Sequence, residues 1–107
     1  MAQKILSPKE LKILVKGYQK KLQDMDIPVN HIYIYGSYAK GKAKKNSDID
    51  LCIVSPAFND RIESTMTLMK IRDDNELVLS PIAFSPKTFN DENPLAWEIK
   101  KTGISLN

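Results

Sequence analysis

The chain has 107 residues, of which 42% are hydrophobic and 27% are charged, and its formal net charge is +3. This length fits one domain, residues 1–107, with a single core, and the composition argues against a disordered chain. The charge is too small to indicate a nucleic-acid-binding protein by itself, and no run of residues approaches the roughly 18 apolar residues of a membrane span.

Cysteine usage and the N-terminus bear on the compartment. Cys52 is the single cysteine, so no disulfide can form within the chain, and its place in the apolar run DIDLCIV predicts a buried thiol in a reducing compartment. The N-terminal segment MAQKILSPKELK lacks the apolar core of a signal peptide. We therefore expect a cytoplasmic protein with no membrane association.

The first predicted element is a helix over residues 8–24. Ser7 can cap it, Pro8 suits the first helical position, and Glu10 can reach back to the cap amide. Apolar side chains then recur at spacings of three and four, which predicts one buried stripe: Leu11, Leu14, Val15, Tyr18, Leu22 and Met25.

Residues 29–35 and 48–54 are predicted to be strands, because both are rich in β-branched or aromatic side chains. Gly36 and Ser37 break the first strand, and a short helical turn is expected over residues 38–40. Since only a dozen residues separate the two strands, we expect them to run antiparallel.

A second long helix is predicted from a cap at Asn59 or Asp60 to about Arg72. Its apolar residues at helical spacing are expected to face the core: Ile62, Met66, Met69 and Ile71. After a turn at 73–75, residues 76–84 are predicted to form a third strand, in which Pro81 indicates an edge position or a bulge.

A polar loop over 86–93 precedes a short helix over 94–102, which Gly103 is expected to end in a left-handed conformation. Trp97 in this helix is predicted to be buried. The order of elements predicts an α/β (α+β) domain with a small mixed sheet of about three strands flanked by helices.

The stretch GSYAKGKAKKNSDID, residues 36–50, carries the chemistry. Asp48 and Asp50 are two apart on a strand, so both carboxylates face one side, roughly 7 Å apart at their bases. Two like charges at this spacing favour a divalent cation, and oxygen ligands suit Mg²⁺. Gly36 and Ser37 offer backbone amides and a hydroxyl to a phosphate group.

The segment also contains four lysines, Lys40, Lys42, Lys44 and Lys45, which can neutralise a triphosphate or a polyanionic partner. Taken singly, each of these features has an ordinary explanation: acids at a strand mouth, a glycine turn and a solvated loop. No aromatic side chain is interleaved with the lysines, since Tyr38 precedes them, so a nucleic-acid-binding accessory domain is the weakest interpretation.

Gly36-Ser37, ten residues and Asp48-Ile49-Asp50 form a GS-x10-DxD pattern. It resembles the nucleotidyltransferase superfamily with the DNA polymerase β-like fold, and in particular its minimal nucleotidyltransferases (MNT). The segments GSYAKG, SDIDL, SPIAFSP and EIKKTGISL extend the resemblance over essentially the whole chain.

The resemblance implies transfer of a nucleoside monophosphate, AMP from ATP, to a hydroxyl group. It assigns nucleotide binding to Gly36, Ser37 and Lys40, and it makes Asp48 and Asp50 the catalytic carboxylates that hold two Mg²⁺ ions. Small members of the family typically pair with a HEPN-domain toxin, so the resemblance also implies an antitoxin that AMPylates a tyrosine of its partner. Nucleic acid is not expected as the direct substrate.

The chain departs from the family pattern at one position. Active members carry a third carboxylate on the next strand, and the corresponding residue here is Ser80. Glu76, expected on the same strand face, lies about 13 Å away along the strand, too far to substitute. The alternative function is therefore a catalytically weak or inactive antitoxin or binding module, which retains a nucleotide site and neutralises its partner by forming a complex.

Overall fold

The computed structural model describes residues 4–106. Its elements follow in this order: α1 (Pro8–Asp24), β1 (His31–Tyr35), β2 (Ile49–Val54), α2 (Arg61–Lys70), a short 3-10 helix η1 (Asp74–Glu76), β3 (Leu79–Phe84), α3 (Pro94–Thr102) and β4 (Ile104–Ser105). No helix among the described residues is long and apolar enough to cross a membrane.

One mixed sheet organises the molecule, with strand order β3-β2-β1-β4. β1 runs antiparallel to β2, as the short connection predicts, and β2 runs parallel to β3. The sequence predicts about three strands. The fourth, β4, pairs with β1 over only two residues, Ile104 and Ser105, which is too short for a periodic pattern to reveal.

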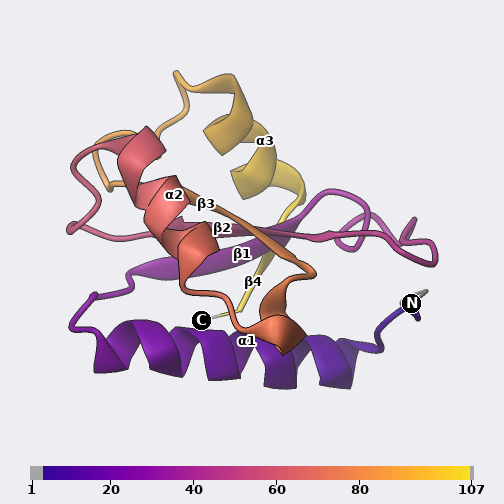
Figure 1. The fold of residues 1–107 in the computed structure, drawn as a ribbon. Coiled ribbons are helices and arrows are strands. Elements are labelled where there is room, and N and C mark those ends of the chain that lie inside the picture. Colours follow the sequence, from indigo (N-terminus) through magenta and orange to yellow (C-terminus); the bar gives the residue numbers. More distant parts are fainter. Residues whose placement is uncertain (1–3, 107) are drawn as a thin grey trace.

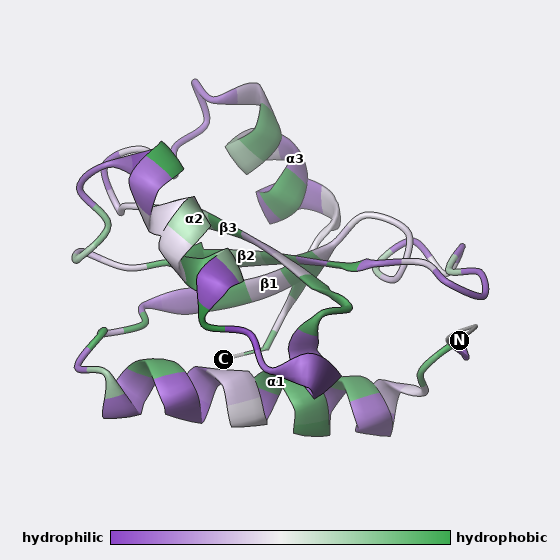
Figure 2. Cartoon of the chain, viewed as in Figure 1, coloured by the Kyte–Doolittle hydropathy of each residue, from purple (hydrophilic) through white to green (hydrophobic). Residues whose placement is uncertain are grey.

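Two layers of helices cover the sheet (Figure 1). α1 packs on one face through Val15, Tyr18 and Leu22, against a core built from the side chains of β1, β2 and β3. α3 packs on the other face through Ala96 and Ile99. Figure 2 shows the result as hydrophobic colour along the central strands and hydrophilic colour along much of the loop between β1 and β2.

Local side-chain chemistry sets the helix ends. Ser7 and Glu10 form the predicted capping box of α1, with Pro8 in its first turn. Asp60 caps α2 by accepting a hydrogen bond from the Glu63 N–H group at 2.9 Å, which decides between the two caps that the sequence allowed.

α2 packs against β3, the outer strand of the sheet, and its side chains close much of that edge. The Ala83 N–H group donates to Thr65 Oγ1 at 3.0 Å, and Arg72 Nη1 donates to the Leu79 carbonyl at 2.8 Å. Pro81 lies between them and has no N–H group, so the predicted edge position of this proline is confirmed.

The predicted core face of α2 is wrong. Ile62, Met66 and Met69 are 76%, 52% and 42% exposed, whereas Leu68 is fully buried and Ile71 is partly buried against the core. The reason is the position of α2 at the rim of the sheet, where a helix contacts its neighbours through a narrow side only.

The sequence predicts that Glu76 begins a strand, and this is wrong. Glu76 belongs to η1, which Asp73 caps through a reciprocal capping box. The Glu76 side chain is 4% exposed and forms an ion pair with Lys21 of α1. The Lys21 ammonium also donates to the Ile71 carbonyl at 3.0 Å. This group of contacts joins α1 to the segment that leads into β3.

Two predictions about the C-terminal helix are also wrong. Trp97 is 48% exposed, with Lys101 Nζ 4.6 Å from the centre of its ring. Gly103 has a φ of −75°, which any residue adopts. Its glycine is needed for another reason: a Cβ there would lie 2.5 Å from the Ile99 carbonyl oxygen.

Candidate functional site

The residues of the predicted site meet at one end of the sheet, on the face that α3 covers. β1 ends at Tyr35, directly before Gly36, and Tyr35 is the register partner of Asp50 on β2. Asp50 is in turn the register partner of Ser80 on β3. The sheet therefore aligns three strands side by side at this level, with Asp50 in the middle.

Gly36 lies directly against the carboxylate of Asp50. It has a φ of +73°, and a Cβ at this position would collide with Asp50 Oδ2 and lie 3.1 Å from Asp50 Cγ. Glycine is therefore required twice, for the left-handed backbone and for the close approach. The contact brings together the two halves of the GS-x10-DxD pattern.

The backbone after Gly36 folds into a hydrogen-bonded turn where a short helical turn was predicted. The Lys40 N–H group donates to the Gly36 carbonyl at 3.1 Å, and the Lys42 N–H group donates to the Ser37 carbonyl at 2.8 Å. The Tyr38 hydroxyl accepts a hydrogen bond from the Leu6 N–H group at 3.1 Å. This bond fastens the turn to the segment before α1.

The lysines of the loop divide into two groups. Lys40 Nζ is 3.4 Å from Glu98 Oε1 of α3, and both side chains are about half exposed. Lys42, Lys44 and Lys45 are exposed and form no ion pair with any described residue. Lys40 is thus the lysine that is held between the turn and α3, while the other three form a basic rim.

Asp48 is exposed and Asp50 is half-buried. Burial raises the pKa of the Asp50 carboxyl above its usual range, and the negative charge of Asp48 raises it further. Within residues 4–106, no lysine or arginine forms an ion pair with either carboxylate. Two acids that repel each other and lack a protein cation are suited to a divalent ion.

The donor set fits Mg²⁺ in its usual protein environment. Mg²⁺ binds through one or two carboxylates, keeps several waters and takes further oxygens from phosphates, and Asp48 and Asp50 supply the two carboxylates. The described residues contain no cluster of three or more His, Cys, Asp or Glu side chains with ligand geometry. Among the described residues, a metal ion at this place would therefore be held by these two acids.

No third acid stands at the position next to Asp50 on β3. The register places Ser80 there, as the sequence predicts. Glu76 is buried beside Lys21, at the opposite layer of the molecule from α3. Its carboxylate is engaged in that ion pair and in the bond from the Asp73 N–H group.

Two side chains near the site were not predicted from the sequence. Burial raises the pKa of Tyr35 to about 12, the Asp50 charge adds to the rise, and the Arg61 charge opposes it. Tyr35 could have been found by alternation, because the residue before Gly36 must share a face with its partner Asp50. No sequence signal indicates that Arg61, at the start of α2, reaches toward this face.

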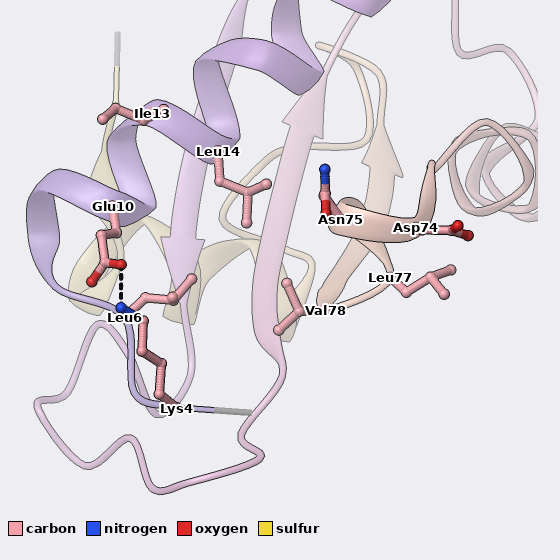
Figure 3. Close-up of a pocket in the computed structure, with 9 residues that line it drawn as sticks. All are labelled: Lys4, Leu6, Glu10, Ile13, Leu14, Asp74, Asn75, Leu77 and Val78. Carbon is pink, nitrogen blue, oxygen red and sulfur yellow. Dashed lines mark ion pairs between the residues drawn. The ribbon is translucent and has the colours of Figure 1, made fainter. Parts of the chain in front are cut away.

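The groove that Figure 3 draws, about 600 Å³, lies elsewhere. Its side chains come from α1 with the residues before it, from η1, and from the segment between η1 and β3. They include Ile13 and Leu77, which are 64% and 57% exposed. None of the predicted site residues lines this groove.

Comparisons with known proteins show the family and the fold. Residues 14–103 match the family model of the nucleotidyltransferase domain. Comparison with curated proteins gives no significant match.

Solved structures with the same fold include a toxin–antitoxin crystallised with AMP-PNP. That structure is 24% identical, with a TM-score of 0.56 over 86% of this chain and 72% of the other. A candidate nucleotidyltransferase from Sulfolobus solfataricus is 18% identical, with a TM-score of 0.60 over 88% and 77% of the two chains. A mutant of the toxin–antitoxin MntA–HpeT is 21% identical, with a TM-score of 0.56 over 86% and 71%.

Proposed function

Because this chain belongs to the nucleotidyltransferase domain family, we propose that it transfers a nucleoside monophosphate, AMP from ATP, to a hydroxyl group. The observation that carries the proposal is the contact between Gly36 and Asp50. It joins a turn suited to phosphate and a carboxylate pair suited to a metal ion, and a metal–triphosphate complex needs both. The MNT resemblance of the sequence supports the choice of AMP.

Each residue of the site has a stated role in this proposal. Gly36 and Ser37 hold the β- and γ-phosphates through backbone N–H groups and a hydroxyl, and Lys40 adds positive charge beside them. Asp48 and Asp50 would hold Mg²⁺, two ions by the family resemblance, which neutralises phosphate charge when bound. The weak exposed pair between Lys40 and Glu98 can exchange for a phosphate at little cost.

The transfer itself asks the chain mainly for positioning. The acceptor oxygen forms a bond to the α-phosphorus, the bond from that phosphorus to pyrophosphate breaks, and the hydroxyl proton passes to water. Ser80 cannot serve as the base near neutral pH. We therefore expect a slow enzyme whose rate depends on how well the acceptor is presented.

We further propose that the acceptor belongs to a HEPN-domain toxin and that the chain acts as its antitoxin in the cytoplasm. The support is the resemblance to minimal nucleotidyltransferases and the likeness in fold to two toxin–antitoxin structures. The second candidate function is an antitoxin that binds its partner and nucleotide without transfer. Ser80 beside Asp50 favours this second candidate.

The test uses ATP labelled at the α-phosphorus, Mg²⁺ and the protein encoded beside this one, which the proposal expects to contain a HEPN domain. Label should appear on the partner with the wild-type chain and be lost with Asp48→Ala and Asp50→Ala, whereas Asp24→Ala, an exposed acid of α1, should behave as wild type. ATP labelled at the γ-phosphorus should transfer nothing, which distinguishes AMP transfer from phosphorylation. Tight binding of ATP and partner with no transfer would establish the binding module instead.

A further inference from the structure

The two ends of the proposed reaction must lie on opposite sides of the carboxylate pair. In a displacement at phosphorus the attacking and leaving oxygens are roughly in line. If Gly36 and Ser37 hold the leaving pyrophosphate at the end of β1, the acceptor oxygen must arrive from the other side of β2. The strand on that side is β3.

An apolar surface lies further along β3, on the same face of the sheet. Ser80 and Ile82 are two apart on β3 and share the face of Asp50. Beyond them α2 exposes Ile62 and Met66, and the two elements enclose a shallow groove of about 340 Å³. We call Arg61, Ile62, Met66 and Ile82 the α2 strip. Exposed apolar side chains gathered on one surface are typical of an interaction surface.

Arg61 gives this strip a charge. Its guanidinium lies 4.3 Å from the centre of the Phe84 ring, and it pairs with no carboxylate of the described residues. Phe84 belongs to the buried cluster on the face that α3 covers, so the guanidinium lies beside that face. A guanidinium held in an apolar groove without a counterion is complementary to a carboxylate from outside.

The backbone of β3 limits how an occupant can bind. Pro81 lacks an N–H group, the Ala83 N–H group bonds to Thr65, and the Leu79 carbonyl accepts from Arg72. An incoming peptide would find no continuous row of donors and acceptors there, so it cannot add as a further strand. The occupant has to bind through its side chains.

We propose that the α2 strip docks the segment of the partner protein that carries the acceptor hydroxyl. That segment is apolar, bears a carboxylate that pairs with Arg61, and packs on Ile62, Met66 and Ile82 as a helix or compact turn. This inference rests on the proposed function. It adds the surface of this chain that binds the partner segment carrying the acceptor hydroxyl.

The test compares Arg61→Glu and the double variant Ile62→Asp/Met66→Asp with wild type. The substituted side chains are exposed, so the fold should persist, and circular dichroism with a thermal melt checks this. The binding partner in this test is the protein encoded beside this chain, as in the test of the proposed function. Four quantities are measured: the dissociation constant of the complex with this partner, the KM and the kcat of AMP transfer to it, and the affinity of the free chain for Mg·ATP.

We expect both variants to weaken partner binding and raise the KM for the partner by about tenfold or more, with kcat and Mg·ATP affinity within about twofold of wild type. Reversing the charge of one acidic residue on the partner should restore binding to Arg61→Glu. The matched control is Ile13→Asp, which changes a similarly exposed apolar residue in the groove of Figure 3. This variant should bind the partner normally.

Different failures have different meanings. Normal partner binding by both variants, or an equal loss with Ile13→Asp, overturns the α2 strip and leaves the proposed transfer intact. If Arg61→Glu loses Mg·ATP affinity together with partner binding, Arg61 contacts the nucleotide. That result also overturns the proposal that the α2 strip docks the partner. Wild-type protein that neither binds the partner nor labels it refutes the proposed function, and this inference fails with it.

Discussion

A side chain at Gly36 and the carboxylate of Asp50 cannot both be accommodated with Asp50 in its present position, because a Cβ at Gly36 would overlap Asp50 Oδ2. Gly36→Ala should therefore displace Asp50 as well as strain the turn. Gly41 has nearly the same φ, +69°, and a Cβ added there would meet no atom within 4 Å. Gly41→Ala therefore isolates the backbone cost of about 1 kcal/mol.

We expect Gly36→Ala to lose at least as much stability as Gly41→Ala in urea titrations, and only Gly36→Ala to lose Mg·ATP affinity, by about tenfold or more. Calorimetric titration of the two proteins measures the difference. Equal affinities would show that the position of Asp50 does not matter for nucleotide binding.

Asp50 should be a site where function costs stability. Burial and the Asp48 charge raise its pKa in the folded state, so its ionised form is disfavoured by folding, and stability falls as the pH rises through the folded pKa. Asp50→Asn removes that penalty. At pH 7 we expect the free energy of unfolding to increase, by less than about 1 kcal/mol after solvent screening, while AMP transfer is lost.

The stability gain should shrink toward zero as the pH falls below the unfolded-state pKa of about 3.9, where Asp50 is protonated in both states. Urea titrations at pH 7 and pH 3 check this, with Asp24→Asn as the control that should change little. A destabilised Asp50→Asn protein at pH 7 would contradict the electrostatic picture of the pair.

Ser80→Glu should convert a site of two acids into one of three. The register puts residue 80 beside Asp50, and a carboxylate there can accept the proton of the acceptor hydroxyl. If the missing base limits the reaction, single-turnover transfer should rise by about tenfold or more. The added negative charge should also lower the stability of the metal-free protein.

The control for this gain is Ser80→Gln, which has similar size and no charge and should not accelerate transfer. Unchanged rates in Ser80→Glu would mean that proton removal is not limiting, and no transfer in either protein would favour the binding module.

The ion pair between Lys21 and Glu76 should matter for stability far more than the one between Lys40 and Glu98. Glu76 is 4% exposed and accepts bonds from both Lys21 and the Asp73 N–H group, so Glu76→Ala should cost about 2–3 kcal/mol. Glu98→Ala breaks a half-exposed contact and should cost about 0.5 kcal/mol or less. Chemical denaturation of both variants gives the comparison, and equal costs would contradict it.

Cys52 should be chemically inert in the folded protein. Its side chain is fully buried, and burial raises the pKa of the thiol to about 12, so at pH 8 only roughly one molecule in ten thousand carries a thiolate. Ellman's reagent should react with it only after unfolding in guanidinium chloride. Rapid reaction under native conditions would show that the α3 layer opens readily.

The sequence predicts the parts of the fold that depend on local chemistry. The capping box of Ser7 and Glu10 fixes the start of α1, and the short loop after Gly36 fixes the antiparallel pairing of β1 with β2. The alignment of Asp50 with Ser80 was expected from the family resemblance, which puts residue 80 at the position of the third acid. The residues meant to form the site do gather at one end of the sheet; their roles stay predictions.

Features that depend on packing between distant segments were not predictable. Ile62 and Met66 have the spacing of a core face, but α2 lies at the rim of the sheet and leaves them exposed. Glu76 follows Asp73 at the spacing of a capping box, which is a signal for a helix start. The apolar run after Glu76 favoured a strand instead, and the prediction followed that run. Arg61 reaches the α3 face only because α2 packs against β3, which no local pattern encodes.

The closed edge of β3 has a consequence for the free protein. An exposed strand edge is the usual starting point for aggregation, and here Pro81, the bond from Ala83 to Thr65 and the bond from Arg72 to Leu79 remove its hydrogen-bonding row. The α2 strip presents side chains only. Contacts between strips of two copies would therefore not extend a β-sheet from one copy to the next. We therefore expect the free protein to resist edge-to-edge pairing of its copies along β3.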